Sequence, residues 1–419
     1  MNTLRTFSPK IAFVVFLLIQ TAALAWTARN PRAIDFAVYY LTAHALQNGS
    51  NIYTLTDAEW TALAEQYRVH EATRPYLYPP LTAGVVGTFA SLPYPQALLV
   101  WTILSVMATT LSGFALSRLT SGRWIDPVVF GALAVYVPIL TTLYAGQVNT
   151  FVLLGLAFYL YRSQGLIASG SALAASLLLK PIAAPLLAHL LWRRDLRRLM
   201  AVVASLIVLA IGMTLLVGLP SSIAYVENAF QLSTLSTDAS PEAYPPNQSL
   251  LGFFGRVLTA HNYGPSLTHN PPLARLLWLG CAGLLLLGVA FLTWPRGKRG
   301  DATLGLETGL VLVTINLIVP ISWYHHAVIS IIPLVLAWRA SPTNRMRAWL
   351  VAAFVLINVQ GLLWHWFVGH TLLLSLGTYG LLIIYAITGA CLFSIRRQQA
   401  RADLAERTPP DQIVSGTRA

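Results

Sequence analysis

The chain has 419 residues, of which 56% are hydrophobic and only 10% are charged. Soluble domains carry about 25% charged residues, so this composition excludes a soluble enzyme and indicates a protein that crosses a membrane many times. The net charge of +12 does not indicate nucleic-acid binding, because the basic residues cluster in short segments between apolar stretches, as topology signals do.

Apolar stretches recur along the whole chain, and the length suits about 12 helical spans. The hydropathy pattern places them at 11–28, 79–92, 97–119, 127–144, 147–162, 166–192, 199–217, 276–294, 303–320, 327–339, 348–366 and 371–394. We therefore expect an all-α membrane protein with one polytopic domain over residues 1–395. Two long hydrophilic loops interrupt this domain, at 29–78 and 218–275, and a charged, proline-containing tail at 396–419 is expected to be disordered.

The basic clusters decide the expected orientation. Placing the clusters at 192–198, 296–300 and 396–401 in the cytoplasm puts both termini there and both long loops outside. Two topologies stay open for 79–192: either 79–92 and 166–192 each cross once, or 79–92 is shallow and 166–192 is a hairpin broken at Lys180-Pro181. The second places the arginines of this region inside. The expected location is the inner (plasma) membrane.

Short helices are expected in the first outer loop. A helix should begin near Asp35 in "DFAVYYLTAHALQNG" and stop at Asn48-Gly49. A second should cover 56–67, with Thr56 or Asp57 as its cap. These helices would lie at the membrane surface.

Asp35 is a lone acid in an apolar helix start, just after the first span, and Tyr39 lies one turn further along the same face. One interpretation is a favourable interaction with the helix dipole. The other is a general base at the outer surface. A single base suits the transfer of a sugar from a lipid phosphate, because a phosphate leaving group needs no proton, whereas glycoside hydrolysis normally needs two carboxyl groups.

Four basic or histidine side chains are candidates for holding such a phosphate: His325 and His326 in "SWYHHAV", Lys180 after an apolar run, and Arg256 in the large outer loop. A lysine inside a membrane segment is a functional hypothesis by default. Interfacial packing of the histidines, snorkelling of Lys180 and a solvated loop position for Arg256 are the alternatives.

Candidates for binding sugar or acceptor hydroxyls are Tyr39, Gln147, Asn149, Trp323 and Tyr324. The last two also fit an interfacial aromatic belt, and the two amides could simply satisfy helix ends. No cluster has metal-ligand spacing and no loop matches a nucleotide fingerprint. We therefore expect no metal and no cofactor, and a lipid-linked donor.

Several segments, in order, resemble one family. "DFAVYY", "YLYPPL", "GQVN", "LLLKPIAAPLL", "NQSLLGFFGRVL" and "ISWYHHAVISIIPL" are similar to the polyprenol-phosphate-mannose-dependent mannosyltransferases of glycosyltransferase family 87. The resemblance implies a multi-spanning GT-C-type fold, with Asp35 as catalytic base and His325 or His326 at the donor phosphate. The resemblance also implies that Lys180 and Arg256 contact the donor phosphate.

The resulting hypothesis is an inverting transferase on the outer (periplasmic) face. It would move a sugar, with mannose as first choice, from a polyprenyl-phosphate donor to a hydroxyl of a glycolipid or glycan acceptor and leave an α-linked product. A flippase of lipid-linked sugars and a polyprenyl-diphosphate-dependent ligase or polymerase are the alternatives. A flippase should show inverted repeats, and the sequence has no such internal symmetry.

Overall fold

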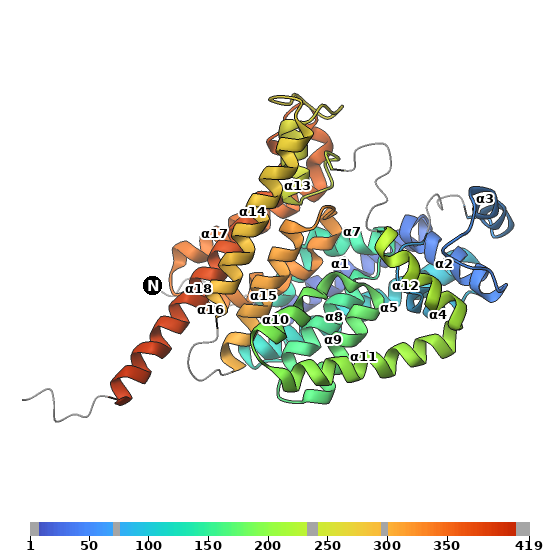
Figure 1. Ribbon diagram of the computed structural model, residues 1–419. Helices are drawn as coiled ribbons and strands as arrows, with labels where there is room; N and C mark the ends of the chain where they lie inside the picture. The colour runs from blue at the N-terminus through green and yellow to red at the C-terminus, as the bar shows by residue number, and fades with distance from the viewer. Residues whose placement is uncertain (1–7, 70–75, 233–241, 295–300, 408–419) are drawn as a thin grey trace, which may run out of the picture.

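The computed structural model describes residues 8–69, 76–232, 242–294 and 301–407 (Figure 1). Within these ranges the regular structure is helical, and the β contact present is an isolated antiparallel bridge between Asn247 and Trp323. The predicted all-α fold is thereby confirmed.

Six described helices are long and apolar enough to cross a membrane. They are α1 (Pro9–Arg29), α5 (Tyr94–Ser121), α11 (Leu196–Val217), α14 (Pro271–Leu292), α17 (Asn344–Leu363) and α18 (Leu376–Arg407). On α14 and α11 most of the apolar side chains face outward, as with Leu284 at 70% exposure and Leu215 at 83%. Such a continuous apolar exterior is what a lipid environment requires.

Two further apolar pairs are bent at a short break. Helix α6 (Pro127–Val135) meets α7 (Val137–Ala145) at 50°, and α9 (Leu166–Leu179) turns by 119° into the 3₁₀ turn η1 (Pro181–Ala183) and α10 (Pro185–Trp192). The second break falls at Lys180-Pro181, where the proline ring cannot continue the α-helix that precedes it. The predicted break of 166–192 at Lys180-Pro181 is therefore present, and the choice between the two topologies stays a prediction.

Shorter helices complete the chain. Inside the bundle lie α8 (Asn149–Tyr161), α15 (Asp301–Ile318) and η2 (Tyr324–Ser330), which continues into α16 (Ile331–Ala340). The connecting segments carry α2 (Ile34–Gln47), α3 (Asp57–Gln66), α4 (Leu81–Gly87), α12 (Leu219–Leu232), α13 (Leu250–Leu258), η3 (Trp364–Phe367) and η4 (Leu373–Ser375).

The expected count of 12 spans is not reached in the described residues. Length and composition give six spans, or eight if each bent pair is one span. Several predicted spans form helices too short for a bilayer: α4 has 7 residues and α8 has 13. At 1.5 Å per residue a 13-residue helix is about 20 Å long, two thirds of a hydrocarbon core.

The start of the predicted tail is also helical. Helix α18 runs to Arg407, because "RRQQARADLAER" is rich in strong helix formers that extend the preceding span. Residues 408–419 lie outside the described part.

The two helices expected in the first outer loop are confirmed. Thr56 caps α3 through a capping box with Glu59, in which each residue satisfies the other's backbone N–H. Helix α2 has Asp35 in its first turn and Asn48 at its C-cap, followed by Gly49 at φ +75°.

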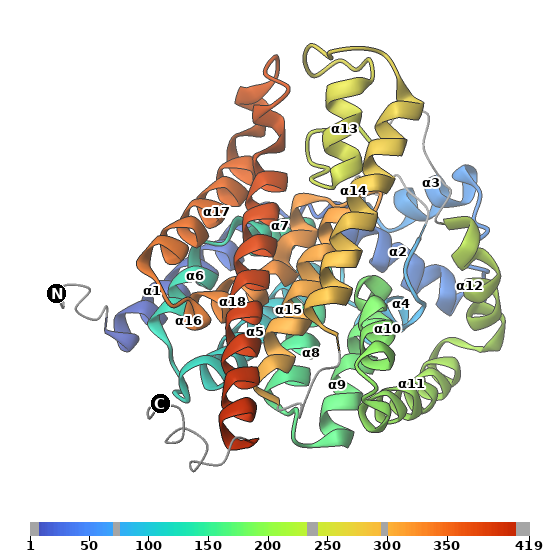
Figure 2. The ribbon, with the colours of Figure 1, turned by 60° about the vertical axis from the view of Figure 1, so that its left-hand side comes forward.

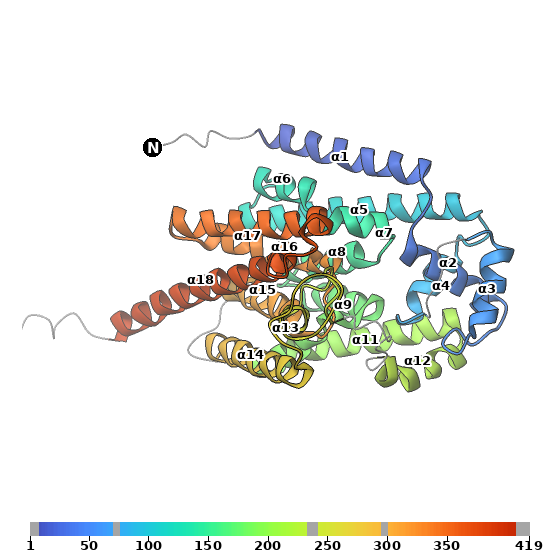
Figure 3. The same cartoon turned by 90° about the horizontal axis from the view of Figure 1, so that it is seen from above.

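The loop helices gather at one end of the bundle. Helices α2, α3, α4 and α12 lie together at the right of Figure 3, whereas α1 begins and α18 ends on the opposite side. The turned view shows α13 and the upper part of α14 rising beside the upper part of α18 (Figure 2). Helix α1 thus begins and α18 ends on the side of the molecule opposite to α2.

Candidate active site

Helix α2 is held firmly in place. Its side chains from Phe36 to Ala45 are buried, and the Phe36 ring lies 5.8 Å from the ring of Trp101 on α5. Trp101 in turn donates from its indole nitrogen to the Gly146 carbonyl at 2.8 Å. Gly146 has φ +68°, and a Cβ there would lie 2.5 Å from the Phe36 Cβ, so glycine is needed both for the turn and for the close approach.

Tyr39, one turn after Asp35, begins a hydrogen-bonded chain. Its hydroxyl donates to Gln147 Oε1 at 3.0 Å, and Gln147 Nε2 donates to the Tyr78 hydroxyl at 2.8 Å. Burial raises the pKa of both tyrosines, and the negative charge of Asp35 raises the pKa further. Both phenols therefore stay protonated and can donate hydrogen bonds.

Lys180 joins this chain from the break between α9 and η1. It is buried, and its ammonium donates to Asn149 Oδ1 at 3.0 Å and lies 2.9 Å from His326 Nε2. The ammonium also lies 5.4 Å from the centre of the Tyr78 ring, within the range of a cation–π contact. Asp35 acts electrostatically on Lys180, so an acid and a base of opposite charge share one site.

The histidine pair closes the cluster. Asn149 Nδ2 donates to the His325 carbonyl at 3.1 Å, which ties η2 to α8. Burial, followed by the charge of Lys180, lowers the pKa of His325 and His326, so both rings are neutral. Because the ammonium donates to His326 Nε2, the neutral His326 ring carries its proton on Nδ1.

The histidine pair offers a polar group beside the Lys180 ammonium. His325 Nε2 is buried and makes no hydrogen bond to any described residue, whereas the His326 ring lies within hydrogen-bonding reach of the Ile321 backbone. The ammonium supplies a positive charge and His325 a neutral polar group beside it, which is the chemistry that a phosphate oxygen requires.

Of the two predicted aromatic residues, Tyr324 lies at the cluster and Trp323 points away from it. Tyr324 lies next to His325, and the charge of Asp35 acts on its hydroxyl. Trp323 instead packs edge-on against Tyr244, with ring centres 5.6 Å apart, beside the bridge to Asn247. Trp323 is therefore oriented toward the long segment 218–275.

Arg256 does not join the cluster. It is fully buried, and its guanidinium donates to the carbonyls of Tyr244 and Asn247 and, through two nitrogens, to the Ser375 hydroxyl. These protein acceptors occupy its donors, so the structure gives no support for the predicted phosphate contact. Because the sequence places Arg256 in a predicted outer loop, its burial inside the protein was not expected.

Tyr78 was not among the predicted site residues, although it connects Gln147 to Lys180. The sequence could have indicated Tyr78, since it lies in "YLYPPL", one of the segments that carry the family resemblance. Among the described residues, no group of three or more His, Cys, Asp and Glu side chains could hold a metal. The expectation that the reaction needs no metal stays a prediction.

Comparison with known proteins places this cluster in context. The sequence model of glycosyltransferase family 87 matches residues 76–320, more than half of the chain. The chain is 27% identical over 388 residues to the polyprenol-phosphate-mannose-dependent alpha-(1-2)-phosphatidylinositol mannoside mannosyltransferase of Mycolicibacterium smegmatis, covering 82% of this chain and 79% of that relative. No solved structure matches significantly.

Proposed function

The chain belongs to glycosyltransferase family 87, and on that premise we propose that it is an inverting mannosyltransferase that uses polyprenyl-phosphate-mannose. The observation that carries the proposal is the cluster of Asp35, Tyr39, Lys180 and the histidine pair, in which the charge of Asp35 acts on the buried ammonium of Lys180. The relative in Mycolicibacterium smegmatis is named for the same donor.

In the proposed reaction the acceptor hydroxyl approaches Asp35, which takes its proton as the oxygen attacks the anomeric carbon of the mannose. The bond between this carbon and the phosphate oxygen breaks, and polyprenyl phosphate leaves with its electron pair. Lys180 stabilises the charge that develops on the leaving oxygen. The attack comes from the face opposite to the phosphate, so a β-linked donor gives an α-linked product.

The neutral histidines complement this role. His326 accepts a hydrogen bond from Lys180 through Nε2, which holds the ammonium in position. His325 Nε2 is a buried polar atom that can contact the donor. Tyr39, Gln147 and Asn149 then orient sugar or acceptor hydroxyls from the adjoining part of the network.

We place the reaction on the outer face of the inner membrane, with both termini in the cytoplasm. Two observations support this orientation. Helix α1 begins and α18 ends on the side opposite to α2 (Figure 3), and Arg193 and Arg396, from two of the basic clusters, share one buried acid, Glu307. Basic residues gathered on one side of a membrane protein mark the cytoplasmic side.

The proposed acceptor is a glycolipid with a free mannose hydroxyl. The relative is named for phosphatidylinositol mannoside, so this lipid is the first acceptor to test. A product with one more mannose, sensitive to α-mannosidase, is the expected result when the protein in proteoliposomes receives radiolabelled polyprenyl-phosphate-mannose.

The same assay separates the alternatives. A flippase would move label across the bilayer and leave it on the polyprenyl phosphate, and a diphosphate-dependent ligase or polymerase would ignore the monophosphate donor. Either outcome, with no new glycosidic bond on the acceptor, would contradict the proposal.

A further inference from the structure

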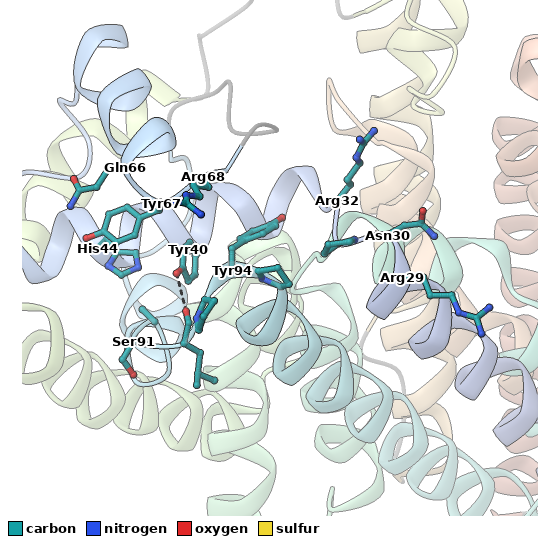
Figure 4. A pocket seen from close by; sticks show the side chains of 15 residues that line it. Arg29, Asn30, Arg32, Tyr40, His44, Gln66, Tyr67, Arg68, Ser91 and Tyr94 are labelled. Atoms are coloured by element: carbon teal, nitrogen blue, oxygen red, sulfur yellow. Dashed lines mark hydrogen bonds between the residues drawn. The ribbon is translucent and has the colours of Figure 1, made fainter.

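A cavity of about 810 Å³ lies beside α2 but on a different face from Asp35 (Figure 4). Tyr40 and His44 of α2 line it, one helical turn apart, whereas Asp35 and Tyr39 do not. The remaining walls come from the end of α1, the end of α3 and the turn from α4 into α5. Its volume falls within the range of small-ligand sites, about 300–1,000 Å³.

Specific side-chain contacts fix the walls of this cavity. The Tyr40 hydroxyl donates to the Leu92 carbonyl at 2.9 Å, and the Tyr94 hydroxyl bonds the Ala33 carbonyl at 3.2 Å. The His44 ring stacks on Tyr67 with centres 3.6 Å apart. These contacts join the first outer loop to the start of α5, so the cavity is preformed.

The lining is strongly basic. Arg29, Arg32 and Arg68 all contribute to it, and none of the described lining residues is an acid. Figure 4 shows Arg68 beside Tyr40 and Tyr67 at one end, and Arg29 and Arg32 toward the other. Arginine is the residue best suited to a phosphate, because its planar fork can bond two oxygens at once.

His44 provides an independent sign of a ligand. The side chain is 7% exposed, it lines the cavity, and its Nε2 is buried without a hydrogen-bond partner among the described residues. Burial lowers the pKa of His44, so the ring is neutral and offers a hydrogen bond rather than a charge. Buried polar atoms normally have a partner, and a bound molecule can supply it here.

The cavity lies where two candidate spans meet the membrane surface. Helix α1 ends at Arg29 and α5 begins at Tyr94, and the two helices run side by side (Figure 3). Their outward residues are apolar, as with Trp26 at 58% exposure on α1 and Met107 at 53% on α5. A ligand with a polar head in the cavity could therefore keep hydrocarbon chains against these helices.

We propose that this cavity binds the phosphate-bearing headgroup of an anionic glycerophospholipid. Arg29 and Arg32 attract the phosphate at one end of the cavity, Arg68 and the stacked His44–Tyr67 pair contact the headgroup at the other, and the acyl chains follow α1 and α5. The bound lipid supports α2 from the side opposite to the transfer site. It is neither the sugar donor nor the acceptor.

The test is a thermal-unfolding titration of the full chain in neutral detergent. Short-chain phosphatidylglycerol should raise the Tm in a saturable way, whereas matched phosphatidylcholine and inorganic phosphate at the same concentration should not. The double variant Arg29→Gln/Arg68→Gln should bind phosphatidylglycerol roughly 30-fold more weakly, from about a fivefold contribution of each arginine. The control Arg123→Gln removes an exposed arginine outside the cavity.

Each outcome decides the proposal. An unchanged titration of the double variant, or an equal effect of phosphatidylcholine, would overturn it, and a shift with inorganic phosphate alone would assign the cavity to a free anion. The double variant must have the same Tm as the wild type in the absence of lipid. If it does not, the single variants Arg68→Lys and Arg68→Gln are compared instead. Arg68→Lys keeps the charge and should retain binding, whereas Arg68→Gln should weaken it about fivefold. Equal binding by these two single variants would also overturn the proposal.

Discussion

Lys180 Nζ lies 2.9 Å from His326 Nε2, although 146 positions separate the two residues in the chain. The contact joins the break after α9 to the start of η2. It sets the tautomer of His326, and it holds a cation beside the helix that carries Asp35. The reaction proposed for this site depends on that cation.

Replacing Lys180 by Met keeps the length of the side chain and removes the charge. We expect transfer to fall by about 10²–10³-fold, the usual effect of losing one group that stabilises a developing anion. The KM for the lipid-phosphate donor should rise more than the KM for the acceptor. Steady-state kinetics in proteoliposomes measures both, and the exposed Arg275→Gln serves as control. An unchanged donor KM and kcat would contradict the assignment.

The histidines predict a pH dependence of stability. The pKa of His326 lies well below its ordinary value of 6.5 in the folded protein. Below about pH 6.5 the unfolded chain therefore binds a proton that the folded chain does not, so stability falls as the pH falls. His326→Asn keeps an acceptor for Lys180 but does not titrate, and the fall in Tm between neutral and acidic pH should become shallower.

Comparison of the two Tm curves in one detergent checks this point. Curves of equal steepness would show that His326 does not take up a proton on unfolding. A steeper curve for the variant would contradict the sign of the shift.

Two glycines with the same backbone conformation give a matched pair. Gly146 has φ +68° and Gly122 has φ +70°, but a Cβ meets Phe36 at the first position and open space at the second. Alanine at Gly122 should cost about 1–2 kcal/mol for the left-handed backbone alone. Alanine at Gly146 should cost about 1–3 kcal/mol more, from overpacking against α2.

Thermal unfolding and the transfer assay report this difference separately. Gly146→Ala should also lose transfer, because α2 carries Asp35, whereas Gly122→Ala should keep it per folded molecule. Equal losses of stability in the two variants would contradict the tight packing of Phe36 on Gly146.

A buried acid distant from the proposed chemistry should matter for stability alone. Glu307 is fully buried and pairs with Arg193, and with Arg396 at 2.7 Å. Glu307→Gln leaves two arginines without their anion and should cost about 3–5 kcal/mol. The control Glu242→Gln breaks the exposed pair with Arg275 and should cost less than about 1 kcal/mol.

Unfolding midpoints of the two variants measure this contrast. Transfer per folded molecule of Glu307→Gln should match the wild type. A stability equal to that of Glu242→Gln would show that the buried pairs contribute little.

The local features of the fold were predictable because local rules govern them. The capping box of Thr56 and Glu59, the acidic start of α2 and the break at Lys180-Pro181 each depend on a few neighbouring residues. The number of spans was not predictable in the same way. Hydropathy measures apolar length, and it cannot tell a spanning helix from a short buried one such as α8.

The site residues show the same difference between features that depend on local sequence and features that depend on distant contacts. Asp35 and Lys180 stood out because a charge in an apolar segment is unusual. Tyr78 and the folded-in position of Arg256 depend on contacts between residues 69 and 119 positions apart. The spacing of residues within one segment does not predict contacts with such distant segments.

The central claim is that Asp35 is the general base, and Asp35→Asn tests it most directly. Asp57, an exposed acid at the start of α3 in the same loop, provides the matched control Asp57→Asn. Both variants are reconstituted at equal amounts of folded protein with labelled polyprenyl-phosphate-mannose and phosphatidylinositol mannoside. We predict that Asp35→Asn transfers mannose at least about 10³-fold more slowly, as for loss of a general base, while Asp57→Asn transfers normally. Near-normal transfer by Asp35→Asn would contradict the account.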